Sequence, residues 1–190
     1  MGLFTKYTKL TDEALMKRLQ NKDVKAFDEL YQRYYSKLYG FVLKMMKYNK
    51  PASDDIIQEV FLKLYQFPER FDITKKFKPW VYTVVANDCQ KTFRIKELAP
   101  LNEVEHFTTG FDMKNQANLT EFMQKLNIQL NQVSVEQKEV FILKHQGGLS
   151  LKEIAEVQNC ALGTVKSRLH TVTKFLAESL EPHKEKLLHL

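Results

Sequence analysis

The chain has 190 residues, 44% of them hydrophobic, and a formal net charge of +6 at pH 7. This length suits one medium domain or two small ones, and the positive charge favours an anionic partner. No segment approaches the ~18 consecutive apolar residues that a membrane span needs, and the first residues lack the apolar core of a signal peptide. The composition therefore argues against membrane insertion, and we expect a cytoplasmic protein.

Only six glycines and five prolines interrupt the chain, and apolar residues recur at helical spacing between them, which predicts an all-α fold. We expect four helices before residue 97, three of them with a capping residue. They are 12–20 capped by Thr11, 24 to about 48 capped by Asp23, a helix that starts at Ser53 and runs to Phe67, and about 80–96 after a loop from Pro68 to Pro79.

Residues 97–118 contain Pro100 and Gly110, show no apolar period and carry more acids than bases, so we interpret them as a flexible linker. Helices resume near Leu119, and Ser134 can cap one that Gly147 and Gly148 end. The chain is therefore expected to form two small helical domains. Their ranges are 1–96 and 119–182, joined by the linker 97–118 and followed by a tail, 183–190.

The segment 150–175 has the pattern of a helix-turn-helix. Ser150 and Glu153 have the spacing of a capping box that starts the first helix, and Gln158 to Cys160 form the turn, where Asn159 is a candidate cap. In the second helix, one set of residues at helical spacing should face the core: Val165, Leu169, Val172 and Leu176. A second set then lies on the opposite face, which a helix-turn-helix inserts into the DNA major groove: Lys166, Ser167, His170, Thr171 and Lys174.

Cationic and aromatic side chains alternate between residues 67 and 96. The cations are Lys75, Lys76, Lys78, Lys91, Arg94 and Lys96, and the rings are Phe67, Phe71, Phe77, Trp80, Tyr82 and Phe93. Cations that follow a phosphate backbone, beside rings on which bases stack, suit single-stranded nucleic acid. The alternative is a ring core with solvated lysines. Trp80 shares a helical stripe with three valines, which is typical of a core, whereas the pattern leaves core and base contact equally open for Phe71 and Phe77.

The helix expected from Ser53 has an apolar stripe and an opposite face with acidic residues. The stripe consists of Ile56, Ile57, Val60, Phe61 and Leu64. The opposite face carries Asp55, Gln58, Glu59, Leu62 and Lys63. An acidic face with an exposed leucine disfavours DNA, so it either docks on a basic protein surface or is a solvated face.

Three segments in this order resemble bacterial RNA polymerase sigma factors. DDIIQEVFLKLYQF is similar to their polymerase-binding helix, FKPWVYTVVANDCQKTFR to their promoter-melting helix, and LSLKEIAEVQNCALGTVKSRLHTV to their C-terminal helix-turn-helix. The small two-domain size resembles the extracytoplasmic-function (ECF) class. The resemblance covers about residues 10–180 and implies a factor that directs core RNA polymerase to promoters and helps to melt their −10 region.

The resemblance also implies roles for individual residues. Asp55, Gln58 and Glu59 would bind the clamp helices of the polymerase largest subunit, and Leu62 lies beside them on the same face. Two residues would line a pocket for a flipped −10 base, Phe71 and Asn87, with cations around them at Lys75, Lys76, Lys78, Lys91 and Arg94. In the second domain, Lys166 and Ser167 would contact duplex DNA of the −35 element, together with the neighbouring His170, Thr171 and Lys174. Arg168 lies near the core edge, where a phosphate contact or an internal bond is expected. Many sigma factors are held by an anti-sigma factor, which makes such a protein a further candidate partner.

The length of the linker bears on how the two domains reach a promoter. Its 22 residues extend to about 75 Å at most, and twenty base pairs span about 70 Å, so the two domains need a surface that holds them apart. Polymerase is the surface that the resemblance implies.

Three other functions are possible. A conventional dimeric helix-turn-helix regulator binding duplex operator DNA explains the second domain but neither the acidic helix nor the ring-rich basic segment. A basic membrane-binding protein fits poorly, because the cationic helices are interrupted and have core stripes. An enzyme fits poorly too, since Cys89, Cys160 and the five histidines have no ligand spacing and catalytic motifs are absent. We expect free thiols, no metal, no cofactor and no catalytic residues.

Overall fold

The computed structural model describes residues 7–98 and 121–180, and all regular secondary structure in these two ranges is helical. Contacts divide the chain into two compact units, whose described parts are 7–42 with 51–98, and 43–50 with 121–180. The all-helical, two-domain prediction is therefore confirmed. Most of the predicted linker and the whole predicted tail lie outside the described residues.

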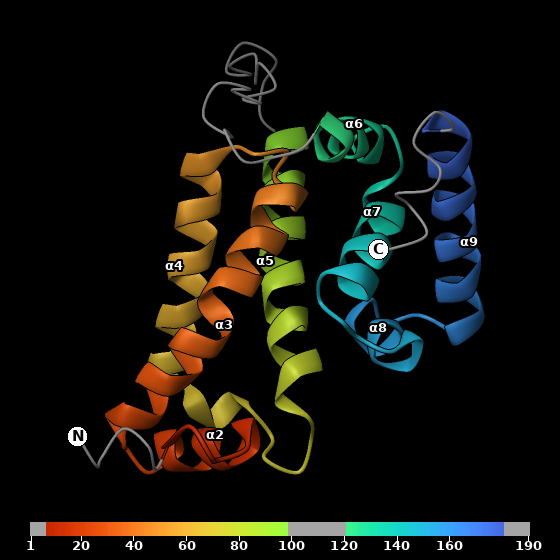
Figure 1. Cartoon of the computed structure of the whole chain (residues 1–190). Helices are drawn as coiled ribbons and strands as arrows, with labels where there is room; N and C mark the ends of the chain where they lie inside the picture. Colours follow the sequence, from red (N-terminus) through yellow and green to blue (C-terminus); the bar gives the residue numbers. More distant parts are fainter. Residues whose placement is uncertain (1–6, 99–120, 181–190) are drawn as a thin grey trace. The chain divides into compact units, whose positions relative to one another are not determined.

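The described part of the first domain forms four α-helices and a short 3-10 helix (Figure 1), although the contacts assign residues 43–50, at the end of α3 and the start of α4, to the other unit. They are α2 (Asp12–Gln20), α3 (Val24–Met45), α4 (Lys50–Gln66), η1 (Pro68–Arg70) and α5 (Phe77–Leu98). The helices α3, α4 and α5 lie side by side, and α2 crosses one end of this bundle. Their apolar stripes meet in a core that includes Leu19, Leu30, Phe41, Phe61 and Val85.

The first two helices begin where the sequence predicts. The hydroxyl of Thr11 accepts a hydrogen bond from the Ala14 amide at 3.2 Å and caps α2, as expected. The Asp23 carboxylate, expected to cap α3, accepts hydrogen bonds from the side chains of Tyr7 at 2.9 Å and Arg18 at 3.5 Å. α3 ends before Tyr48, its expected end, because Lys47 and Tyr48 adopt left-handed φ angles of 53° and 63°.

Two later helices begin earlier than predicted, and in both a proline lies in the first turn. α4 already includes Pro51, so Ser53, the expected cap, is buried inside the helix. α5 begins at Phe77 rather than Trp80 and includes Pro79. The first N–H groups of a helix have no intrahelical acceptor, so a proline there costs no hydrogen bond. Placing both prolines outside the helices was wrong for this reason.

In its described part, 121–180, the second domain packs four helices around a core of its own. They are α6 (Glu121–Leu130), α7 (Val135–His145), α8 (Leu151–Val157) and α9 (Leu162–Ser179). α9 packs against the other three. The core cluster combines residues from α6, α7 and α9 with the residue that follows α9: Phe122, Leu126, Leu130, Phe141, Val172, Leu176 and Leu180.

Local signals in the sequence position the helix-turn-helix. The capping box expected at Ser150 is formed, and Ser134, expected as a cap, also forms a capping box, with Gln137. Gly147 permits the turn after α7, because a Cβ atom there would lie 2.7 Å from the Leu143 carbonyl oxygen. Asn159 does not cap α9 as expected. It lies in the turn with a left-handed φ of 46°, and Ala161 occupies the cap position without a side-chain hydrogen bond.

Candidate nucleic-acid and protein interfaces

The exposed face of α4 carries the residues predicted to bind a protein partner. Asp55, Gln58, Glu59 and Leu62 are all exposed, and Leu62 retains 45% of its accessible surface. The opposite stripe is buried throughout, as predicted: Ile56, Ile57, Val60, Phe61 and Leu64. An exposed leucine beside carboxylates suits a partner surface that has both apolar and basic residues.

The basic residue beside this face is neutralised within the domain. The Lys63 ammonium lies 2.9 Å from Asp88 Oδ1 on α5 and 3.4 Å from Glu59 Oε1 on α4. Burial alone would lower the pKa of Lys63, but these two carboxylates raise it above its usual value. Because its charge is paired, Lys63 does not reverse the negative character of the α4 face.

A row of aromatic rings runs along α3 beside α4. The rings of Tyr31 and Tyr35 stack with centroids 5.0 Å apart, and those of Tyr35 and Tyr39 stack at 5.7 Å. Phe61 of α4 packs against Tyr31 at 4.7 Å, and the Tyr39 hydroxyl donates a hydrogen bond of 2.7 Å to Asp54. Tyr31 is 39% exposed. The acidic face of α4 is thus flanked by a partly exposed aromatic surface.

The ring cluster near the start of α5 lies in the core. Phe71 is 1% exposed and Phe77 is fully buried, with their ring centroids 5.5 Å apart in an edge-to-face arrangement. Phe77 also meets Tyr34 edge to face at 5.1 Å, and Trp80 lies 5.1 Å from Phe71. The Phe71 ring is therefore part of the core in this structure, and its implied role beside a flipped −10 base stays a prediction.

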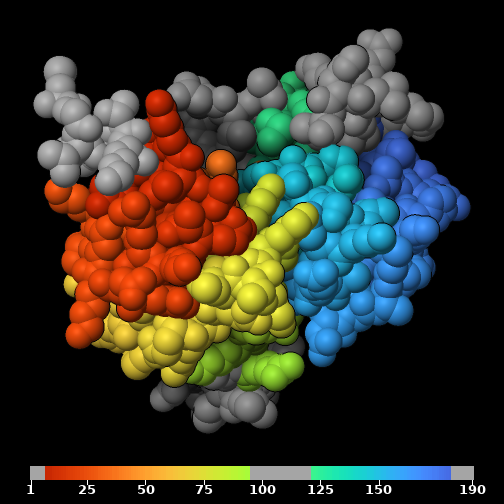
Figure 2. Space-filling model, turned by 90° about the horizontal axis from the view of Figure 1, so that it is seen from below, coloured from red at the N-terminus to blue at the C-terminus, as the bar shows by residue number. Residues whose placement is uncertain are grey.

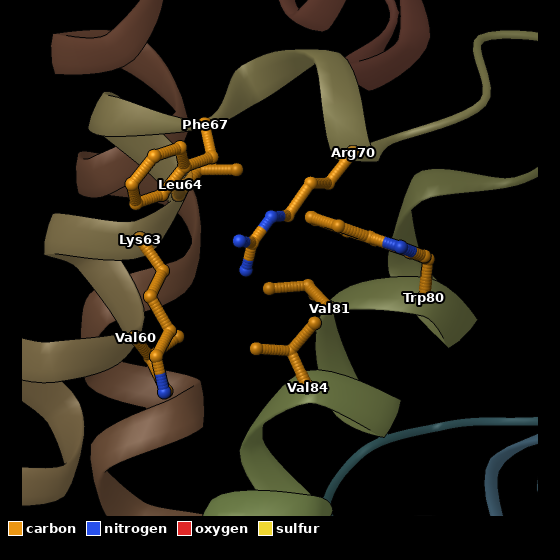
Figure 3. Close-up of a pocket in the computed structure, with 8 residues that line it drawn as sticks. All are labelled: Val60, Lys63, Leu64, Phe67, Arg70, Trp80, Val81 and Val84. Atoms are coloured by element: carbon orange, nitrogen blue, oxygen red, sulfur yellow. The ribbon is translucent and has the colours of Figure 1, made fainter.

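A mostly apolar pocket of about 60 Å³ lies between α4, η1 and α5 (Figure 3). It is lined by Val60, Lys63, Leu64, Phe67, Arg70, Trp80, Val81 and Val84. The side chain of Arg70 extends into the space between the two walls, and its guanidinium carbon lies 4.5 Å from the centre of the Phe67 ring. Sequence patterns did not identify Arg70 or Leu64 as pocket residues, because the pocket forms only when three elements meet.

A polar and basic track continues from this pocket along α5. Trp80, Val84, Asn87, Lys91 and Arg94 follow one another at steps of three or four residues, which places them on one helix face. Asn87, Lys91 and Arg94 are exposed. The structure therefore places Asn87 beyond Val84 on the face that lines the pocket, with two cations following it.

The remaining cations of this region lie near the start of α5. Lys75 and Lys76 are exposed in the segment before the helix, and Lys78 is half-buried in its first turn. These three lysines lie at the same end of the domain as Trp80. Phe77 stands between Lys76 and Lys78 in the sequence, and its ring centroid lies 5.8 Å from that of Trp80.

The recognition helix α9 presents the predicted polar face. Its residues Lys166, Ser167, His170, Thr171 and Lys174 are all exposed, while Val165 and Val172 are fully buried. Arg168 makes an internal bond, one of the two contacts expected for it, with Nη1 donating to Gln158 Oε1 at 2.8 Å and lying 3.6 Å from Cys160 Sγ. Gln158 in turn donates to the Glu136 carbonyl at 3.0 Å. Arg168 therefore ties α9 to the turn and to α7.

Two further features concern metal binding and membrane spans. Within the described ranges, no three His, Cys, Asp or Glu side chains gather as a metal site, and both cysteines are free thiols. Among the described helices, none combines the length and the apolar character of a membrane span.

Comparison with known families accounts for both domains. The family model of sigma-70 region 2 matches residues 30–97, and that of sigma-70 region 4 matches residues 124–176. Two similar proteins are ECF RNA polymerase sigma-E factors. The one from Haemophilus influenzae is 28% identical, over 91% of this chain and 97% of its own length. The one from Escherichia coli K12 is 29% identical, over 91% and 96%.

Solved structures agree with the fold. The sigma factor RpoE of Bartonella quintana, crystallised with the anti-sigma factor NepR, has a TM-score of 0.67 at 24% identity and covers 83% of this chain and 98% of its own. CnrH, in complex with the cytosolic domain of CnrY, has a TM-score of 0.69 at 18% identity and covers 90% and 98%.

The domain that contains α4 and α5 matches the region 2 model, and the helix-turn-helix domain that follows it matches the region 4 model. Together these two matches define the class of protein. The chain belongs to the sigma-70 family of RNA polymerase sigma factors, in the extracytoplasmic-function class. It is a transcription initiation factor, and the reading as a conventional operator-binding regulator is not favoured.

Proposed function

We propose that the protein docks on core RNA polymerase through α4, captures the separated −10 strand along α5, and holds duplex −35 DNA with α9. The observation that carries this proposal lies in the first domain, where an acidic, partly apolar face and a basic, pocketed face occur together. The acidic face repels DNA and the basic face attracts it, so the two faces suit different partners.

The docking face consists of Asp55, Gln58, Glu59 and Leu62. Leu62 supplies apolar area, and the two carboxylates with the amide supply acceptors for Arg or Lys of the partner. The family resemblance supports the clamp helices of the polymerase largest subunit as this partner surface. The tyrosine row of α3 borders the face, and the hydrogen bond between Tyr39 and Asp54 holds the two helices in register.

Strand capture uses the pocket and the track beyond it. Arg70 is exposed, and displacement of its side chain would open the space against Trp80 for a base and free the guanidinium to pair with a phosphate. Asn87 offers an amide for a base edge, and Lys91 and Arg94 offer backbone charge. Stacking contributes about 1–3 kcal/mol per base, and flipping a base costs roughly a few kcal/mol, so capture offsets melting. Lys75, Lys76 and Lys78 add charge where the strand enters.

Duplex binding belongs to α9. Lys166, Ser167, His170 and Thr171 lie on the face that enters the major groove, and Lys174 lies one turn further, towards the phosphates. Arg168 supports this face from behind through Gln158. The protein acts by binding alone, in the cytoplasm where polymerase transcribes, and an anti-sigma factor that covers the docking face is a further proposed partner.

Run-off transcription tests the proposal. A promoter is first selected from random duplex DNA by binding to the complex of this protein with core polymerase. Transcription from that duplex should require the protein, whereas a template that is already melted around −10 should need it much less. Equal transcription from both templates without the protein would contradict the proposal, and so would tight, specific promoter binding by the protein without polymerase.

A further inference from the structure

The segment that connects α4 to α5, residues 67–76, is fastened at both of its ends to α2. Figure 2 shows the surface of α2, in red, directly beside the yellow surface of this connector. The connector carries Arg70 of the pocket wall and the exposed Lys75 and Lys76. α2 itself carries none of the residues proposed to touch DNA or polymerase, so its contacts with the connector need another explanation.

The first fastening is made by Gln20, at the end of α2. Its side-chain nitrogen donates to the Pro68 carbonyl at 3.0 Å and to the Phe71 carbonyl at 2.9 Å. An amide nitrogen has two hydrogens, so these two bonds use its whole donor capacity. Both acceptors are backbone carbonyls, and they lie about 50 residues away in the sequence, at the start and end of the η1 turn.

The second fastening is made by Glu13, seven residues before Gln20 in α2. Its Oε1 accepts a hydrogen bond of 3.0 Å from the backbone N–H of Phe77, the first residue of α5. That N–H has no partner within its own helix, and a carboxylate is favoured at a helix N-terminus. Glu13 therefore fixes the point at which the connector ends and α5 begins.

Between these fastenings the connector is already shaped. Asp72 Oδ1 accepts from the Thr74 amide at 2.9 Å and from its hydroxyl at 2.7 Å, and the Lys75 amide donates to the Asp72 carbonyl at 3.0 Å. The buried rings of Phe71 and Phe77 anchor either side. A loop held in this way presents its exposed side chains without the entropy loss that a free loop would suffer on binding.

We infer that Gln20 and Glu13 are positioning residues, which hold the connector in the shape that captures the separated promoter strand. The inference rests on the proposed function of α5 and the pocket. Neither side chain touches the nucleic acid. Each acts through backbone atoms, Gln20 through the carbonyls of Pro68 and Phe71 and Glu13 through the amide of Phe77.

Isosteric substitutions separate this role from a general structural one. Gln20→Glu keeps the shape but replaces a donor with a carboxylate oxygen facing two carbonyls, and Gln20→Ala removes the group. Glu13→Gln keeps an acceptor for the Phe77 amide, whereas Glu13→Ala does not. Gln132→Ala, at an exposed glutamine of the second domain, is the matched control.

The test uses the full chain bound to core polymerase, with the single-stranded non-template −10 oligonucleotide of the selected promoter as the probe. Gln20→Glu, Gln20→Ala and Glu13→Ala should each weaken oligonucleotide binding about tenfold, which corresponds to the loss of one or two hydrogen bonds. Run-off from the duplex should fall in parallel. Run-off from the pre-melted template at saturating protein, and affinity for core polymerase, should stay within about twofold of wild type. Glu13→Gln and Gln132→Ala should resemble wild type in every assay.

Three outcomes would overturn the inference. One is unchanged oligonucleotide binding by the Gln20 variants, and the second is an equal loss of polymerase affinity and strand binding, which would indicate a structural role. The third is unchanged hydrogen exchange of residues 72–77 in Gln20→Ala, because a released connector must exchange faster while α3 stays protected. A different result, failure of the wild-type complex to bind the oligonucleotide, would contradict the proposed function itself. It is distinguishable from the three outcomes above, because those are seen only in the variants.

Discussion

Lys63 of α4 and Asp88 of α5 form an ion pair, with Nζ 2.9 Å from Oδ1 and 3.1 Å from Oδ2. The pair joins the helix proposed to dock on polymerase to the helix proposed to hold the separated strand. Their side chains retain 30% and 17% of their accessible surface, so the pair is partly shielded from water. A displacement of α4 can therefore be transmitted to α5 through this direct polar contact as well as through the packed core.

Lys63→Met should reduce the free energy of unfolding by about 0.5–1 kcal/mol at neutral pH, a value appropriate to a partly solvated pair. Because the pKa of Lys63 is raised in the folded state, its stabilising contribution is fully present below the unfolded pKa. It is lost as the pH rises through the folded pKa, above the ordinary value of 10.5. Urea unfolding at pH 7 and above pH 11 measures both effects. An equal difference between variant and wild type at both pH values would contradict the assignment.

Phe71→Ala should destabilise the first domain by about 3–5 kcal/mol, because it empties a buried ring site between Phe77 and Trp80. Phe71→Leu should cost less, since it refills much of the volume. Urea denaturation followed by the Trp80 fluorescence measures the change. Exposed Phe67→Ala is the control and should change stability by well under half as much. A Phe71→Ala protein as stable as wild type would show that the ring is not a core element.

Val84→Phe should block the pocket without disturbing the docking face. Val84 is half-buried at the pocket wall, so a larger ring there fills space that the base would occupy. Binding of the single-stranded −10 oligonucleotide to the polymerase complex should fall about tenfold or more, comparable with the loss of one stacked base. Thr83→Val, on a neighbouring position of the same helix, serves as the comparison. Unimpaired strand binding by Val84→Phe would place the captured base elsewhere.

Lys166→Ala and Arg168→Ala should affect duplex binding differently. Lys166 is exposed, so its loss should weaken −35 binding and lower the slope of log affinity against log salt by about one if it contacts a phosphate. Arg168 is bonded to Gln158, so its loss should leave the salt slope unchanged and reduce the stability of the second domain by about 1–2 kcal/mol. Fluorescence anisotropy over a salt series, with parallel thermal unfolding, distinguishes them. The reverse pattern would mean that Arg168, not Lys166, meets the phosphate.

Features confined to one helix were predictable from the sequence. The stripe of α4 follows directly from the spacing of Ile56, Val60 and Leu64, and its exposed face follows by exclusion. The same argument placed Val165 and Val172 inside and Lys166 outside. In each case the periodicity determines which residues share a helix face, and burial of the apolar face leaves the opposite face exposed to solvent.

Features that join distant segments were not predictable. Nothing near Gln20 in the sequence indicates that its amide meets the carbonyls of Pro68 and Phe71, because that contact exists only after α2 crosses the end of the bundle. The burial of Phe71 was left open for the same reason, since a polar neighbourhood in sequence does not exclude a core position. The pocket wall at Arg70 likewise depends on three elements meeting.

The central claim is that the protein works while docked on polymerase through α4, and its affinity for purified core polymerase tests this most directly. Wild type should bind saturably, and the triple variant Asp55→Ala, Gln58→Ala, Glu59→Ala should bind about 100-fold more weakly, as expected for three interface groups with about 3 kcal/mol between them. The variant should keep its helical circular dichroism and nearly the same unfolding midpoint, because all three side chains are exposed and the Glu59–Lys63 ion pair that it loses lies at the surface. Undiminished binding by the folded triple variant, or no binding by wild type at any salt concentration, would contradict the account.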